Sequence, residues 1–176
     1  RLAEDSIRRS EKTVGALSHF YATLESGRQD DARIAQSVQQ LLTEGAALDA
    51  ILWATDGDVW YQEDIQNKTR YQMYRAQLGW PGYRELLGHV RDLEYGQIGY
   101  LYKAPWPAFA QRAGAGESPV AMIVKLRTPQ GGTGVFMAVT TPEKLFASSL
   151  KTYMDDLGRV IMRDRETGQV LFDRRL

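Results

Sequence analysis

The stretch that decides the fold class is Leu48-Asp-Ala-Ile-Leu-Trp-Ala-Thr-Asp-Gly-Asp-Val-Trp-Tyr-Gln62. Apolar and aromatic residues with high strand propensity lie on both sides of Asp56-Gly57, a dipeptide that favours a tight turn between antiparallel strands. The sequence therefore predicts a β-hairpin with strands over 48–54 and 58–62.

Two further hairpins are predicted downstream by the same pattern. Strands over 120–126 and 134–140 are joined by the turn Pro129-Gln-Gly-Gly132, and strands over 159–163 and 169–173 are joined through Glu166-Thr-Gly168. Another strand is expected over 95–103. The first hairpin and the three strands over 95–140 predict a central antiparallel sheet of about five strands.

Helices are predicted before and between the strands. Residues 1–27 have an amphipathic pattern that ends at Gly27, with a seam of residues at heptad spacing: Ile7, Ser10, Val14, Leu17, Tyr21 and Leu24. A partner helix or the chain's own domain could cover this seam, and both alternatives stay open. A second helix is expected from Asp30 or Asp31 to Gly45, followed by a mainly helical segment over 67–91 with a break at 79–82, and a helix after Thr141. The fold class is therefore α+β, with a long N-terminal helix pair.

Composition limits the possible classes of function. The 176 residues fit one domain over 1–176, with helices over 1–46 and the sheet-containing part over 48–173. Basic and acidic residues balance at 22 each, so no net charge favours nucleic acid. Cysteine is absent, which excludes disulfides and cysteine catalysis. The chain starts at Arg1 inside a helical pattern, so we expect a fragment whose membrane spans lie outside the sequence.

The order of these elements resembles the PAS-like extracytoplasmic sensors of the CHASE and Cache families. The resemblance to CHASE domains rests on stretches near both ends of the chain and not on its middle: Ala16-Leu-Ser-His-Phe-Tyr21, Leu48-Asp-Ala-Ile-Leu-Trp53, Gly134-Val-Phe-Met-Ala-Val139, Pro142-Glu-Lys-Leu-Phe146 and Gly158-Arg-Val-Ile-Met-Arg-Asp164. The segment between Ala54 and Gly134 is shorter than in CHASE domains, so a single unit of the Cache type matches equally well.

The resemblance implies a periplasmic, ligand-sensing domain of an inner-membrane receptor. A long helix would leave a membrane span, a small molecule would bind on the sheet, and the signal would pass to a cytoplasmic histidine kinase or a cyclic-di-nucleotide cyclase or phosphodiesterase. A homodimer through the first helix is a further expectation. The alternative is a protein-interaction or dimerisation module without a small ligand.

An aromatic cluster in the middle of the chain is the candidate ligand site. Eight tyrosine and tryptophan residues lie between Tyr71 and Trp106, and Ile98, Tyr100 and Tyr102 fall on one face of the strand predicted there. Aromatic side chains with a polar group suit a small-ligand pocket, and a basic side chain nearby could bind a carboxylate. The predicted ligand-binding residues are Arg75, Trp80, Tyr83, Tyr100, Tyr102 and Lys103. Alternatively, these tyrosines cover the sheet with their hydroxyls at the surface.

Motifs for catalysis or metal binding are not found. His19 and His89 are far apart in the sequence and outside any metal-ligand spacing, and Gly114-Ala-Gly116 lacks the third glycine of a dinucleotide fingerprint. Acidic pairs such as Asp155-Asp156 are expected to be solvated. We therefore predict no enzyme activity, no metal and no cofactor.

Overall fold

The computed structural model describes residues 2–24, 31–42, 46, 48–62, 73–74, 81–102, 120–140, 159–163, 168 and 170–175. Three helices and eight strands lie within these ranges: α1 (Leu2–Ala22), α2 (Asp31–Leu41), β1 (Ala50–Ala54), β2 (Val59–Gln62), β3 (Met73–Tyr74), α3 (Pro81–His89), β4 (Gly99–Tyr102), β5 (Val120–Arg127), β6 (Thr133–Thr140), β7 (Arg159–Arg163) and β8 (Val170–Arg175). The predicted α+β fold class is confirmed. The helix expected after Thr141 lies outside the described residues.

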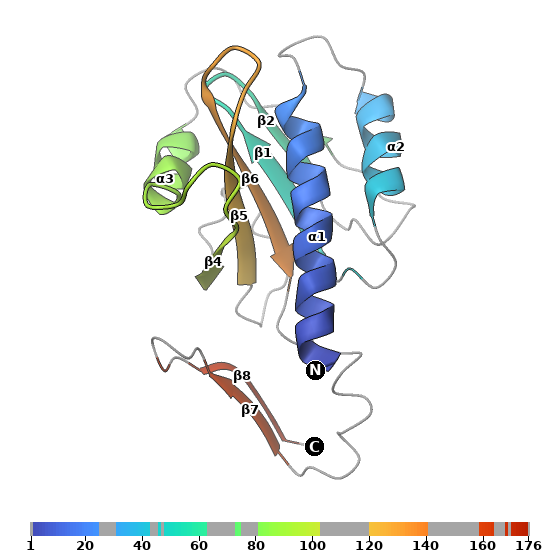
Figure 1. Ribbon diagram of the computed structural model, residues 1–176, viewed down its shortest axis with the longest axis vertical. Coiled ribbons are helices and arrows are strands. Elements are labelled where there is room, and N and C mark those ends of the chain that lie inside the picture. The colour runs from blue at the N-terminus through green and yellow to red at the C-terminus, as the bar shows by residue number, and fades with distance from the viewer. Residues whose placement is uncertain are drawn as a thin grey trace.

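Strands β1 to β6 form one antiparallel sheet in the order β3-β2-β1-β6-β5-β4 (Figure 1). The five strands β2-β1-β6-β5-β4 are the predicted sheet, and the two-residue β3 extends its edge. The expectation of helix at Met73 and Tyr74 is wrong, because the backbone at these residues pairs with Gln62 and Tyr61 of β2. Sheet pairing here overrides the helical spacing of the surrounding aromatic residues.

The predicted third hairpin is confirmed, but it belongs to a separate two-stranded sheet of β7 and β8. Gly168 has φ 69°, a left-handed conformation that suits the glycine predicted in this turn. That the whole of 1–176 is one domain stays a prediction.

Both faces of the six-stranded sheet are covered, with α1 on one side and α3 on the other (Figure 1). We call these the α1 face and the α3 face. The strands read as continuous apolar runs because side chains pointing to either face are buried: all five residues of β1 and seven of the eight in β6 are inaccessible.

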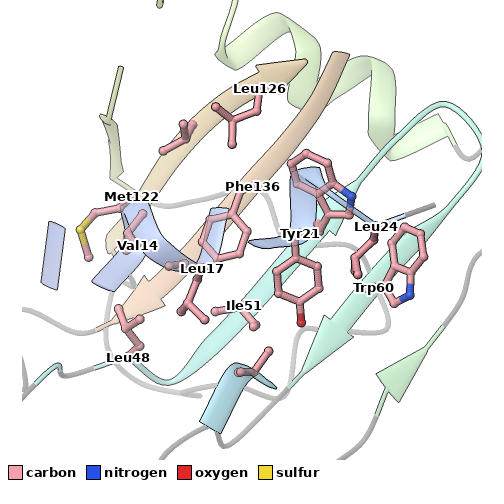
Figure 2. Packing of buried hydrophobic residues seen from close by; sticks show 14 of the residues in the cluster. Val14, Leu17, Tyr21, Leu24, Leu48, Ile51, Trp60, Met122, Leu126 and Phe136 are labelled. Atoms are coloured by element: carbon pink, nitrogen blue, oxygen red, sulfur yellow. The ribbon is translucent and has the colours of Figure 1, made fainter. Parts of the chain in front are cut away.

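The seam of α1 packs on its own sheet. Val14, Leu17, Tyr21 and Leu24 are at most 7% exposed and lie against β1, β5 and β6, together with Phe136 (Figure 2). This decides between the two alternatives for residues 14–24, because a side chain buried in the chain's own core is not available to a partner helix. Ile7, nearer the N-terminus, is only partly buried.

Helix α1 ends earlier than the predicted Gly27. The backbone N–H groups of Thr23 and Leu24 donate to Phe20 and Tyr21, three residues back, at 3.1 Å each. The Thr23 hydroxyl also donates to the Phe20 carbonyl. These bonds tighten the last turn and satisfy backbone carbonyl groups at the end of the helix, which would otherwise lack a partner.

Strand β4 is shorter than the predicted 95–103. A turn occupies the start of that range, where Gly96 has φ 84° and its N–H donates to the Lys125 carbonyl. A left-handed residue interrupts an extended strand, so the regular pairing with β5 begins only at Gly99.

Candidate ligand-binding site

The core of the α3 face is apolar. Its cluster combines strand residues with Tyr83 and Leu86 of α3 and with Val90, which follows the helix; the three repeat at helical spacing. The strand residues of this cluster are Ala50, Leu52, Ala54, Val59, Tyr61, Ala121, Ile123, Val135, Met137 and Val139. None of these side chains carries a full charge. Two charged side chains of β5 lie beside this cluster: Lys125 donates to the Arg91 carbonyl, and both Lys125 and Arg127 lie over the Tyr95 ring.

Tyr83 is fixed at the start of α3. Pro81 begins the helix, and the Tyr83 hydroxyl donates to the carbonyl oxygen of Thr133 in β6, 2.5 Å away. The side chain is 8% exposed. Burial, and then the negative charges of Asp56 and Tyr95, raise the pKa of the Tyr83 phenol. Tyr83 thus joins α3 to the edge of the β5–β6 turn as a neutral hydrogen-bond donor.

Tyr100 lies on the opposite face of the sheet. It is paired with Met122 of β5, packs against the α1-face core, and donates its hydroxyl to Oε1 of Glu11 in α1 at 2.5 Å. Two of the predicted ligand residues, Tyr83 and Tyr100, are therefore separated by the sheet. The structure does not bring them together in one site.

The other predicted ligand residues are only partly within the described structure. Tyr102 is the last residue of β4 and pairs through its backbone with Val120. Arg75, Trp80 and Lys103 lie outside the described residues. Their roles stay predictions.

The contact between Tyr100 and Glu11 joins residues 89 positions apart, and the sequence analysis missed it. The alternation of side chains along β4 indicated which face of the sheet carries Tyr100. It did not indicate its partner, because Glu11 is one of several charged residues on α1. Nothing in their spacing marks this carboxylate as the partner, because only the packing angle of α1 on the sheet places it there.

We expect the Tyr100→Phe variant to lose about 1 kcal/mol of unfolding free energy, because it removes one partly exposed hydrogen bond to a carboxylate. Glu11→Gln should cost less, since the amide oxygen still accepts the bond. Urea denaturation of the two single variants and the double variant measures the coupling. If Tyr100→Phe leaves the unfolding free energy unchanged, the hydrogen bond does not stabilise the fold.

The described residues contain neither a cluster of metal ligands nor a membrane-spanning helix. No group of three or more histidine, cysteine, aspartate or glutamate side chains gathers there in a way that could hold a metal ion. His19 and His89 are both exposed. Within the described ranges, no helix combines the length and apolar character needed to cross a membrane.

A pocket of about 270 Å³ opens at the end of the sheet, between the β1–β2 turn and the β5–β6 turn. Tyr83 contributes to its wall from the α3 side, and Leu24 and Trp60 contribute from the α1 side. Asp56 lies at this pocket. In the sequence, Asp56 is recognisable only as a turn residue, because a local pattern does not reveal that two distant turns lie next to each other.

Comparisons with known proteins find similarity in structure and not in sequence. No family model matches the chain, and no curated protein matches it. Solved structures do match. The sensory domain of the Campylobacter jejuni chemoreceptor Tlp3 with isoleucine bound is 14% identical, with a TM-score of 0.55, over 98% of this chain and 64% of that chain.

Two other solved structures give the same result. The Tlp3 ligand-binding domain in complex with L-valine is 15% identical with a TM-score of 0.55, covering 97% of this chain and 65% of that one. The ligand-binding domain of the Pseudomonas aeruginosa amino acid chemoreceptor PctC, in complex with GABA, is 17% identical with a TM-score of 0.54, covering 97% and 70%.

The chain spans just under two thirds of the length of the Tlp3 domains that it matches. The predicted resemblance to PAS-like extracytoplasmic sensors is confirmed at the level of fold. This chain has the fold of the ligand-binding sensory domains of bacterial chemoreceptors.

Proposed function

We propose that this chain is the extracytoplasmic sensing domain of a membrane receptor and binds a small solute on the α3 face of its sheet. The observation that carries the proposal is the shared fold. The solved structures that match 97% to 98% of this chain are sensory or ligand-binding domains of chemoreceptors. Their ligands are isoleucine, valine and GABA. An amino acid or a related small molecule with an ammonium and a carboxylate group is therefore the solute class to test first.

The proposed site lies between the α3 face and the segment from Tyr71 to Trp106. Tyr83, on this face, is fixed by Thr133, and the strand residues offer an apolar floor. We propose that Arg75 or Lys103 binds the carboxylate, with Trp80 as a further contact. Tyr100 is left out of the proposed site because its hydroxyl is bound to Glu11 on the other face. Tyr102 is left out with it, since residues two apart in a strand belong to the same face.

The receptor context is part of the same proposal. The domain faces the periplasm, has no enzyme activity of its own, and is attached to the inner membrane through segments beyond this sequence. Solute binding changes the packing of α1 on the sheet and passes to a cytoplasmic output domain. A homodimer would use the part of α1 before Ser10, because the seam after it is buried in the chain's own core.

A thermal-shift screen tests the solute. A ligand present at 100 times its dissociation constant adds about 2.7 kcal/mol, which raises the melting temperature of a domain of this size by roughly 5 to 10 °C. We expect isoleucine, valine, GABA or a close analogue to give such a shift. A cooperative melt that no amino acid, organic acid, purine or polyamine shifts would contradict the sensor proposal and favour the interaction module.

A pair of arginine variants locates the site. Arg75→Gln should abolish the shift, whereas Arg84→Gln, at an exposed position on α3, should leave it unchanged. If both variants respond like the unmodified chain, Arg75 is not a ligand residue and Lys103→Gln is the next variant to test.

A further inference from the structure

The pocket at the end of the sheet has walls that are held in place by the protein's own hydrogen bonds. In the β1–β2 turn, the Thr55 hydroxyl accepts from the backbone N–H of Asp58 at 3.0 Å. In the β5–β6 turn, the Thr128 hydroxyl accepts from the N–H of Gly132 at 3.0 Å. Both turns are therefore pre-formed, so a ligand would not need to order them.

The hydroxyl groups around the pocket are also engaged within the protein. The Tyr83 hydroxyl is bound to the Thr133 carbonyl, and the Thr133 hydroxyl is bound to that of Tyr95 at 2.8 Å. These groups contribute to the shape of the wall rather than offering free donors to an anion.

Asp56 has the opposite character. It is exposed, and among the described residues that line the pocket it is the one that carries a charge. In the part of the chain that the structure describes, no hydrogen bond or ion pair is made by its carboxylate. The negative charge of Asp56 also contributes, after burial, to the raised pKa of Tyr83. The pocket therefore combines an available carboxylate with aromatic and aliphatic walls.

This combination selects a class of ligand. A carboxylate forms charge-assisted hydrogen bonds with an ammonium group, and tryptophan, tyrosine and leucine surfaces contact its alkyl part. A divalent metal ion would need more acidic ligands than this single carboxylate. The volume of about 270 Å³ is just below the usual range for ligand pockets, which favours a small ligand.

We propose that this pocket binds a small alkylammonium ion, with Asp56 as its counter-ion. The site shares Tyr83 with the proposed solute site on the α3 face but lies at the end of the sheet, and the inference does not rest on the solute site. Because Leu24 follows α1 and Tyr83 lies in the first turn of α3, an occupant would touch the ends of the elements that cover both faces of the sheet.

Isothermal titration calorimetry with n-propylammonium chloride tests the proposal, using the whole chain at constant ionic strength and 1-propanol as the neutral analogue. We expect saturable binding of the amine at one site and none of the alcohol. Asp56→Asn keeps an oxygen that can accept the hydrogen bond but removes the negative charge, so it should weaken the amine affinity about tenfold.

Asp58→Asn is the matched control, since Asp58 is in the same turn but does not line the pocket. The affinity of the Asp58→Asn variant for the amine should stay within about twofold of that of the unmodified chain. Equal affinities in the Asp56→Asn and unmodified chains, or no saturable heat with the amine, would overturn the proposal. Circular dichroism and melting curves establish that each variant is folded.

The same variants separate this pocket from the solute site. If the proposal is correct, Asp56→Asn loses amine binding and keeps any amino acid response, and Arg75→Gln does the reverse. Loss of both responses in Asp56→Asn would overturn the separation of the two sites. Amine binding without any amino acid response would leave this inference standing and contradict the solute proposal.

Discussion

Gly134→Ala should lower the unfolding free energy of this chain by about 3 kcal/mol, the largest loss we expect from adding a single carbon atom. A Cβ placed on Gly134 in β6 would overlap the six-membered ring of the Trp53 indole. Trp53 is 1% exposed and lies in β1 opposite Phe136, so the ring has little room to move. For a domain of this size, the melting temperature should fall by roughly 6 to 12 °C.

Gly15→Ala is the matched control for this prediction. Gly15 lies in α1, and a Cβ there meets no atom within 4 Å. Alanine favours the helix over glycine by about 0.5 to 1 kcal/mol, so this variant should be slightly more stable than the unmodified chain. The combination of Gly134→Ala with Trp53→Leu should cost less than the two single variants added together, because the smaller side chain leaves space for the new methyl group. Strict additivity would contradict the steric explanation.

The second large effect concerns pH. Burial raises the pKa of the Tyr21 phenol far above its ordinary value of 10.0, since the side chain is 1% exposed in the core between α1 and the sheet (Figure 2). The folded chain then keeps a proton that the unfolded chain releases above about pH 10. Stability from this group is fully present below pH 10 and falls by about 1.4 kcal/mol for each pH unit above it, until the folded pKa is reached.

Urea denaturation between pH 8 and pH 12 measures this effect. Tyr21→Phe keeps the ring contacts with Phe136 and Trp53, whose centroids are 5.7 and 6.4 Å away, so it should be close to the unmodified chain at pH 8. Above pH 10 its stability should fall less steeply. Tyr83→Phe gives the contribution of the second phenol whose pKa is raised. Parallel curves for Tyr21→Phe and the unmodified chain up to pH 12 would show that the Tyr21 phenol does not contribute.

The hairpins were predictable because each depends on residues close in the sequence. Alternating or continuous apolar runs with glycine-containing turns at Asp56-Gly57 and Gly131-Gly132 give strands that pair with their nearest neighbours. Gly131 has φ 83°, a conformation that the turn requires and that glycine adopts at low cost. The helical spacing of the apolar residues in α3 was predictable for the same reason. The start of the helix was not, because α3 begins at Pro81, inside the break predicted over 79–82.

The edges of the sheet were less predictable. The backbone at Met73 and Tyr74 is extended because β2 offers hydrogen bonds to it, although the tyrosine spacing around it is helical. The separation of β7 and β8 into their own sheet is likewise a choice between pairing partners, which no local pattern specifies. In both cases long-range contacts decide, and local propensity does not.

Local turn chemistry and hydrophobic periodicity were enough to predict the α+β class, the three hairpins, the amphipathic first helix and the resemblance to PAS-like sensors. The three-dimensional arrangement was needed to show that the α1 seam covers the chain's own sheet, that Tyr83 and Tyr100 lie on opposite faces, and that Asp56 lines a pocket with the distant β5–β6 turn. Side-chain periodicity specifies the face of an element, whereas strand order and helix docking determine which faces meet. Those depend on contacts between residues far apart in the chain.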